Sequence, residues 1–362
     1  MAQPVAKRVS AWWRQREYQP GRRRLLQAGG AAAGLGLLSG CGSLQSLGLG
    51  RRTPRIGLLY VENPVVHMWM GTWTGRMTEL GHVDGKSVTF ERRIAPNNDG
   101  FDVPAKELVD LKVDVIMAAG WAAMTAARKF TSTIPIVGIS SDPVGTGLVQ
   151  SIQRPGGNTT GVTTLSVALA AKRVEVFKEI IPGLQRTGVM WNSKVPDRTA
   201  EFEETKKALA TFNMPLVDLP VQSPDDFKPA FDQAEAAKVD GLILLFDQLT
   251  LPGATANAFS YGPNIDPLAG LMDEKKIPAV CDVREWAEGS GGLTTYGPDF
   301  HLLFKRTAEM TDKILAGTKP ADIPIEEPST PILTINLDVA RKMGITIPPA
   351  AIQMADHVFP NR

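Results

Sequence analysis

The feature that most constrains the fold is a repeated alternation of short apolar strands with helical segments. In the first half of the chain, strands are expected at 54–60, 87–93, 113–119 and 134–137. In the second half, strands are expected at 186–192, 215–219, 241–246 and 277–281. Strands and helices that alternate through short connections are typical of doubly wound parallel sheets. Since 362 residues exceed one ordinary domain, we predict an α/β protein with two such lobes.

Residues 134–164 mark the passage between the lobes. The apolar strand 134–137 is followed by a polar loop at 140–142 and a helix-capable run to residue 152. An Arg-Pro-Gly-Gly-Asn break at 154–158 precedes an extended segment at 159–164, which we predict to cross into the second lobe.

Residues 291–297 predict a second crossing strand, and 250–269 reads as a long irregular connection, a kind of loop that is usually functional or mobile. The chain is therefore divided into a signal segment at 1–41, a tether at 42–53, a first lobe at 54–162 and 292–325, and a second lobe at 163–291 and 326–358.

Composition and motifs argue for ligand binding rather than catalysis. A formal net charge of +1 and the lack of a basic stripe argue against a nucleic-acid partner. No His, Cys and carboxylate cluster has metal-ligand spacing, and neither a G-x-G-x-x-G fingerprint nor a P-loop occurs, so we expect no metal and no cofactor. No nucleophile elbow or Cys-His pair is found, and Cys281 is expected to be a small buried hydrophobe.

The first fifty residues resemble an export signal. Arg22-Arg23 and the Leu-Leu-Gln that follows at 25–27 resemble a twin-arginine signal, and residues 28–38 form a short, weakly apolar stretch. Cys41 ends a Leu-Ser-Gly-Cys sequence that resembles a bacterial lipobox, which predicts lipidation of Cys41. The alternative is an ordinary thiol in a discarded signal. We therefore expect a lipoprotein anchored to a membrane in the periplasm or cell envelope.

Candidate ligand contacts follow the strands, because doubly wound sheets bind ligands outside the carboxyl ends of their strands. In the first lobe this rule selects Tyr60, Asn63, Gly120, Trp121, Ser141 and Asp142. Trp121 could instead cover a helix end, and Ser141 and Asp142 could be helix N-caps. Trp69 and Trp73, four residues apart, are expected in the core.

Several motifs resemble the bacterial ABC-transporter substrate-binding proteins that include the tryptophan- and tyrosine-type binding proteins. The resemblance runs from Arg55 to Val358 and rests on 113–120, 132–137, 142–145, 154–158, 191–192, 291–293, 296–299, 313–317 and 347–349. It implies a type I periplasmic-binding-protein fold whose lobes close on a small solute, with aromatic amino acids as ligands of characterised relatives. It also implies an ABC permease as partner and no enzymatic activity. The cleft positions that it implies are Asn63, Gly120, Ser141, Asp142, Thr164, Asn192 and Asp247.

Two features depart from the family. Trp121-Ala122 stands where relatives usually carry Thr-Pro, and the segment 250–269 is longer than usual. For an amino-acid ligand, Asp247 or Asp142 is the expected ammonium acceptor, and backbone N–H groups after Ser141 and Trp121 are the expected carboxylate donors.

Trp121, Tyr60 and Tyr296 are the candidates for an aromatic wall. The alternatives are a sensor that presents its closed form to a membrane receptor, and an enzyme on the same fold.

Overall fold

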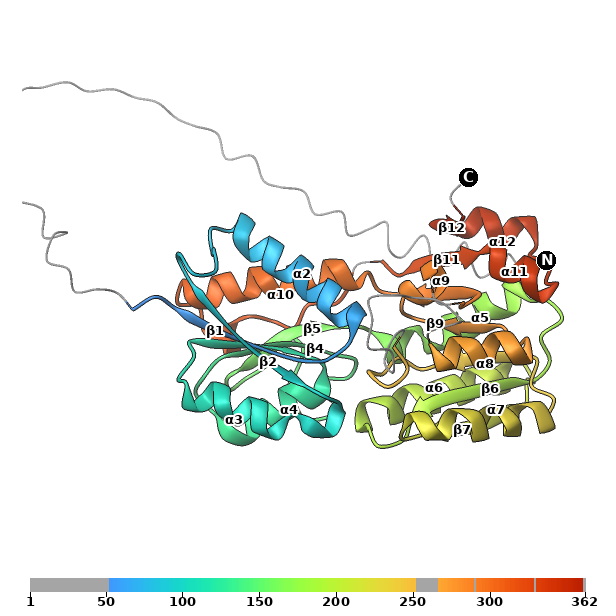
Figure 1. Ribbon diagram of the computed structural model, residues 1–362, viewed down its shortest axis with the longest axis horizontal. Helices are drawn as coiled ribbons and strands as arrows, with labels where there is room; N and C mark the ends of the chain where they lie inside the picture. Colours follow the sequence, from blue (N-terminus) through green and yellow to red (C-terminus); the bar gives the residue numbers. More distant parts are fainter. Residues whose placement is uncertain (1–51, 252–265, 290, 329, 361–362) are drawn as a thin grey trace, which may run out of the picture. The chain divides into compact units, whose positions relative to one another are not determined.

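The computed structural model of the protein describes residues 52–251, 266–289, 291–328 and 330–360. The predicted signal segment with Cys41, nearly all of the predicted tether, and positions 252–265 of the predicted long connection lie outside the described residues. The described chain forms two sheets with helices on both faces, which confirms the predicted α/β class (Figure 1). Within these residues, no helix combines the length and apolar character needed to cross a membrane.

The first sheet has five parallel strands in the order β2-β1-β3-β4-β5. Its strands are β1 (Arg55–Val61), β2 (Thr89–Ala95), β3 (Val115–Ala119), β4 (Ile136–Ser140) and β5 (Thr159–Thr163). Its helices are α2 (Pro64–Glu79), α3 (Asp102–Asp110), α4 (Trp121–Phe130) and α10 (Phe300–Leu315), with the short η2 (Asn98–Gly100). In Figure 1, α2 and α10 cover one face of this sheet, and α3 and α4 cover the other.

The second sheet has the order β12-β11-β10-β9-β8-β6-β7, parallel except where β10 meets β11. Its strands are β6 (Thr187–Asn192), β7 (Leu216–Val221), β8 (Gly241–Leu244), β9 (Ala279–Cys281), β10 (Thr294–Gly297), β11 (Ile332–Asn336) and β12 (His357–Phe359). The helices of this part are α5 (Ser166–Ile180), α6 (Pro196–Thr211), α7 (Phe227–Ala236), α8 (Pro267–Lys275), α9 (Glu285–Gly289), α11 (Leu337–Met343) and α12 (Pro349–Met354). Two further short helices are η3 (Pro224–Asp226) and η4 (Pro320–Asp322).

Two predicted segments differ in the structure. Residues 143–152 form successive turns rather than a helix, because Pro143, Gly145 and Gly147 interrupt the run and Gly147 has a φ of 70°. The predicted first-lobe segment that starts at residue 292 contains β10, which pairs with β9 and β11 of the second sheet. The chain returns to the first sheet only after β10, when α10 packs on α2.

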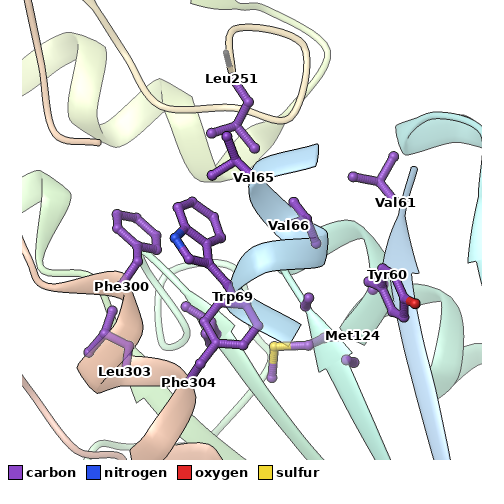
Figure 2. Close-up of a cluster of buried hydrophobic side chains, with 14 of the residues drawn as sticks. Tyr60, Val61, Val65, Val66, Trp69, Met124, Leu251, Phe300, Leu303 and Phe304 are labelled. Atoms are coloured by element: carbon purple, nitrogen blue, oxygen red, sulfur yellow. The ribbon is translucent and has the colours of Figure 1, made fainter. Parts of the chain in front are cut away.

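The core beside the first sheet is built on tryptophans of α2. Trp69 and Trp73 are 2% and 0% exposed, which confirms their predicted core positions. Figure 2 shows Trp69 beside Phe300 and Phe304 of α10. The Trp69 and Phe300 rings are stacked with centroids 4.5 Å apart and planes at 9°. This stacking joins a segment near the start of the chain to one near its end.

Two facing glycines mark a close approach between strands β4 and β5 of the first sheet. Gly161 of β5 lies opposite Gly138 of β4, and a Cβ on Gly161 would lie 1.9 Å from the Gly138 carbonyl oxygen. The φ of Gly161 is 153°, so a side chain there would be both crowded and strained. Thr163 ends β5 immediately before the passage to α5.

Candidate binding site

A cavity lies where the carboxyl ends of strands from both sheets meet the starts of several helices. It holds about 620 Å³ of space between atoms, part of which is open solvent. Its aromatic lining comes from Trp69, Trp121, Phe246, Phe300 and Phe304. Its polar lining comes from Asn98, Ser140, Ser141, Thr164, Asp197, Arg198, Asp247 and Gln248. Such a mostly apolar cavity with a few converging polar groups is typical of a small-molecule site.

The aromatic wall is formed by residues from both parts of the chain. Phe246 follows β8 of the second sheet, and its ring centroid lies 5.0 Å from that of Phe300 and 6.3 Å from that of Trp69. Trp69 Nε1 donates a 2.7 Å hydrogen bond to Glu285 Oε1 at the start of α9. Burial raises the pKa of Glu285 above its ordinary value, although the bond from Trp69 opposes this.

The polar end of the cavity is organised by Asp197. Pro196 occupies the first position of α6 and places Asp197 in the first helical turn. The Asp197 carboxylate accepts from the backbone N–H groups of Ser141 and Asp142 at 3.1 and 2.9 Å, and from Ser140 Oγ at 3.3 Å. A side chain of the second lobe therefore satisfies the donors that follow β4 of the first lobe.

Arg198 is the cationic partner of this carboxylate. Its Nη2 donates to Asp197 Oδ2 at 2.8 Å and to Ser141 Oγ, and its Nη1 donates to Glu201 Oε2 at 2.8 Å. Its guanidinium carbon lies 5.8 Å from the centre of the Phe246 ring. Burial favours neutral Asp197, but Arg198 and the bonds from Ser141 outweigh burial and lower the pKa of Asp197.

A chain of buried ionic contacts continues from Arg198 within the second lobe. Glu201 Oε1 accepts from Arg173 Nη1 at 2.6 Å, and Arg173 Nη2 lies 3.5 Å from Asp282 Oδ2. Ser166 Oγ donates to Asp282 at 2.9 Å and lies 2.8 Å from the hydroxyl of Thr164, which again lines the cavity. The polar end of the cavity is thereby connected to the segment where the chain leaves β5.

Asp247 is a second buried carboxylate at the cavity, 6% exposed. It accepts from Asn98 Nδ2 at 3.1 Å, Asn192 Nδ2 at 2.8 Å and the backbone N–H of Leu249 at 2.9 Å. Asn98 belongs to the first lobe and Asn192 to the second, so Asp247 receives donors from both.

Five predicted contacts line the cavity, namely Gly120, Trp121, Ser141, Thr164 and Asp247. Asn192 reaches the site through its hydrogen bond to Asp247. Trp121 Nε1 and Gln248 Oε1 are buried and have no hydrogen-bond partner among the described residues. Both groups are available to a polar ligand.

The other four predicted contacts have structural partners outside this lining. Asn63 caps α2 by accepting from the N–H groups of Val65 and Val66. The Asp142 carboxylate accepts from the N–H of Gly145.

Tyr60 is buried and packs edge-on to His67 with centroids 5.3 Å apart. Tyr296 packs against the core of the second sheet, and burial raises its pKa to about 12. Ligand contact by these residues stays a prediction.

Sequence reasoning missed the residues that shape the polar end and part of the wall. Asp197 and Arg198 were not among the predicted contacts, although they follow the end of β6 at Asn192 by five and six residues. Phe300 and Phe304 gave no signal, because their role depends on α10 returning to the first sheet. In the part of the chain that the structure describes, no group of His, Cys, Asp and Glu side chains could hold a metal ion.

The chain belongs to the ABC transporter substrate binding protein family, which matches residues 59–359. A tyrosine-binding protein of Clostridioides difficile is 25% identical over 292 residues, which are 79% of each chain. This relative is a binding protein by name. The protein is thus a substrate-binding protein of the ABC-transporter class, as its motifs predicted.

Solved structures confirm the type I periplasmic-binding-protein-like fold. A conserved domain protein from Vibrio cholerae matches with a TM-score of 0.76 at 25% identity, covering 85% of this chain and 100% of that one. An ABC domain in complex with L-Trp from Streptococcus pneumonia matches with a TM-score of 0.75 at 24% identity, covering 85% and 100%. An ABC sugar transporter subunit from Rhodobacter sphaeroides matches with a TM-score of 0.55 at 13% identity, covering 78% and 98%.

Proposed function

We propose that the protein is an extracytoplasmic solute-binding lipoprotein of an ABC importer, and that its two lobes close on an aromatic solute of about the size of tyrosine or tryptophan. The observation that carries the proposal is the cavity itself, which combines an aromatic wall with the buried carboxylate of Asp247. Tyrosine and tryptophan are the ligands named for two similar proteins, which supports an aromatic ligand here.

Closure is expected to depend on groups that reach the cavity from both lobes. Trp121 of α4 and Phe246 after β8 lie on its lining, and Asn98 donates across to Asp247. A ligand that contacts both lobes binds the closed state more tightly than the open state, so it shifts the population towards closure.

The polar end of the ligand is expected to meet Asp247. The carboxylate oxygens of Asp247 receive hydrogen bonds from neutral donors only among the contacts found in the described residues. A ligand ammonium would supply the opposite charge that a buried carboxylate favours. The N–H groups after Ser141, predicted as carboxylate donors, already bind Asp197. The backbone N–H groups at the start of α4, from Trp121 on, remain as donors that face the cavity.

The anchoring part of the proposal rests on Cys41 and the twin-arginine-like sequence before it. Substitution Cys41→Ala is expected to move the protein from the membrane fraction to the soluble envelope fraction and to remove the acyl mass. Unchanged fractionation and mass would contradict lipidation and leave the binding proposal untouched.

The binding proposal is tested by a thermal-shift screen against aromatic amino acids, aromatic amines, purines and sugars. A ligand at about a hundred times its Kd adds about 2.7 kcal/mol of stability, enough to raise Tm by a few degrees. A shift with aromatic compounds, weakened at least about tenfold in Kd by Asp247→Asn, is the expected result. Asp225→Asn on the exposed surface is the matched control. Shifts with sugars or purines alone would refute an aromatic amino acid or aromatic amine as the ligand.

A further inference from the structure

Asp197 occupies the donors that a ligand carboxylate would otherwise use. Its two oxygens accept from the N–H groups of Ser141 and Asp142, from Ser140 Oγ and from Arg198 Nη2. Main-chain N–H groups beside a guanidinium are a strong carboxylate-binding set. Because Asp197 is 3% exposed and bonded through both oxygens, the protein provides this carboxylate itself.

Arg198 is equally engaged within the protein. It donates to Asp197, Ser141 and Glu201, and one face of its guanidinium lies over Phe246. A ligand carboxylate that approached Arg198 would have to compete with two buried carboxylates that are already in place. The cation that lines the cavity is therefore already neutralised.

The buried charges at and behind the cavity sum to a negative value. The carboxylates are those of Asp197, Glu201, Asp247 and Asp282, and the guanidiniums are those of Arg173 and Arg198, all at most 6% exposed. Burial raises the pKa of Glu201, yet with Glu201 protonated three carboxylates still face two guanidiniums. Within the described residues no cation lies within ion-pair distance of Asp247, although Arg198 is near enough to feel its charge.

We propose that Asp197 and Arg198 determine the charge of the ligand, so that the cavity selects aromatic amines, which are monocations, over the corresponding zwitterionic amino acids. This inference rests on the proposed function, since it specifies the ligand class of the same cavity. A monocation balances the excess negative charge near Asp247, whereas a zwitterion adds a carboxylate to it. The start of α4 carries only about half a positive charge, which is smaller than the net negative charge of Asp197, Arg198 and Asp247 on the cavity lining.

The test compares three ligands that share an indole ring and differ in net charge. Binding of tryptamine, tryptophan and indole-3-acetate to the full chain is measured by calorimetry, and tyramine and tyrosine serve as a second pair. We expect tryptamine to bind at least about tenfold more tightly than tryptophan, and tryptophan more tightly than indole-3-acetate.

Two variants of Asp197 show whether this residue causes the preference. Asp197→Ala frees the N–H groups of Ser141 and Asp142 and unpairs Arg198, so the preference should shift towards tryptophan by at least about tenfold. Asp197→Asn keeps the shape, removes the charge and should shift the preference by less. Glu203→Gln, on the exposed side of α6, should leave the ratio unchanged. Circular dichroism confirms the fold of each variant.

Three outcomes would overturn part or all of the two proposals. Tighter binding of tryptophan than tryptamine by the unmodified protein would overturn the charge preference and leave an aromatic ligand standing. An unchanged ratio in folded Asp197→Ala would overturn the role of Asp197. Failure of every aromatic compound to bind the unmodified protein would refute the proposed function, and this inference with it.

Discussion

Replacing Glu285 by Gln is expected to stabilise the protein at neutral pH. The Glu285 side chain is 6% exposed and accepts a 2.7 Å bond from Trp69 Nε1, which a glutamine oxygen can also accept. Burial raises the pKa of Glu285 above 4.5. At pH values between the unfolded and the folded pKa, Glu285 is therefore protonated in the folded state and ionised in the unfolded chain. Stability therefore falls as the pH rises above 4.5 and through the folded pKa. Each unit by which the folded pKa exceeds the unfolded pKa lowers the free energy of unfolding at neutral pH by about 1.4 kcal/mol.

Glu285→Gln is therefore expected to raise the free energy of unfolding near neutral pH, and the gain should vanish below pH 4.5, where the carboxyl is protonated in both states. Urea unfolding followed by circular dichroism at both pH values measures the difference. Glu285→Ala should instead cost about 2–4 kcal/mol, because it leaves the Trp69 indole N–H unsatisfied and opens a cavity.

Glu288→Gln on the same helix breaks a partly exposed pair with Arg284 and should change stability by less than about 1 kcal/mol. His301 lies 3.7 Å from Glu285, but burial lowers its pKa, so its ring is neutral near neutral pH and forms no ion pair there that the substitution would remove. If Glu285→Gln proved destabilising near neutral pH by more than about 1 kcal/mol, ionised Glu285 would be stabilising and the reasoning would fail.

Two further predictions concern the core. Gly161→Ala should cost about 3 kcal/mol of stability, because its Cβ would lie 1.9 Å from a backbone oxygen. Gly183→Ala, with open space around it, is the control and should change stability by less than about 0.5 kcal/mol. Thermal unfolding tests both variants, and equal effects would contradict the packing argument. Burial raises the pKa of the Cys281 thiol well above its ordinary value. In the folded Cys41→Ala protein this thiol should therefore resist a disulfide reagent, and in urea it should react fully. Rapid labelling of the folded protein would contradict the burial of Cys281.

The repeating strands were predictable because each carries its own apolar pattern. All four strands expected in the first half of the chain appear as β1 to β4 with small shifts at their ends. The rule that ligands bind at strand ends located Trp121 and Ser141 on the cavity, and the family resemblance located Asp247 there. Trp69 was also correctly assigned to the core, although it lines the cavity as well.

The features of the fold and the site that could not be predicted depend on contacts between distant parts of the chain. Asp197 meets Asp142 across 55 positions, and only the tertiary structure shows that it fills the donors after β4. Phe300 lines the cavity because α10 returns to the first sheet after β10, a path that local patterns do not encode. The turns at 143–152 reflect competition between helix propensity and three helix-breaking residues.

The path of the chain has a consequence for its synthesis and for its fragments. The first sheet is complete at β5, but its covering helix α10 begins only at Phe300, and the second sheet gains its last strand at residues 357–359. Neither lobe is therefore encoded by one continuous stretch. A ribosome must release nearly the whole chain before either half can close its core, so a nascent chain arrested near residue 295 would expose the face of Trp69 that α10 covers. The two halves are then expected to mature together rather than one after the other.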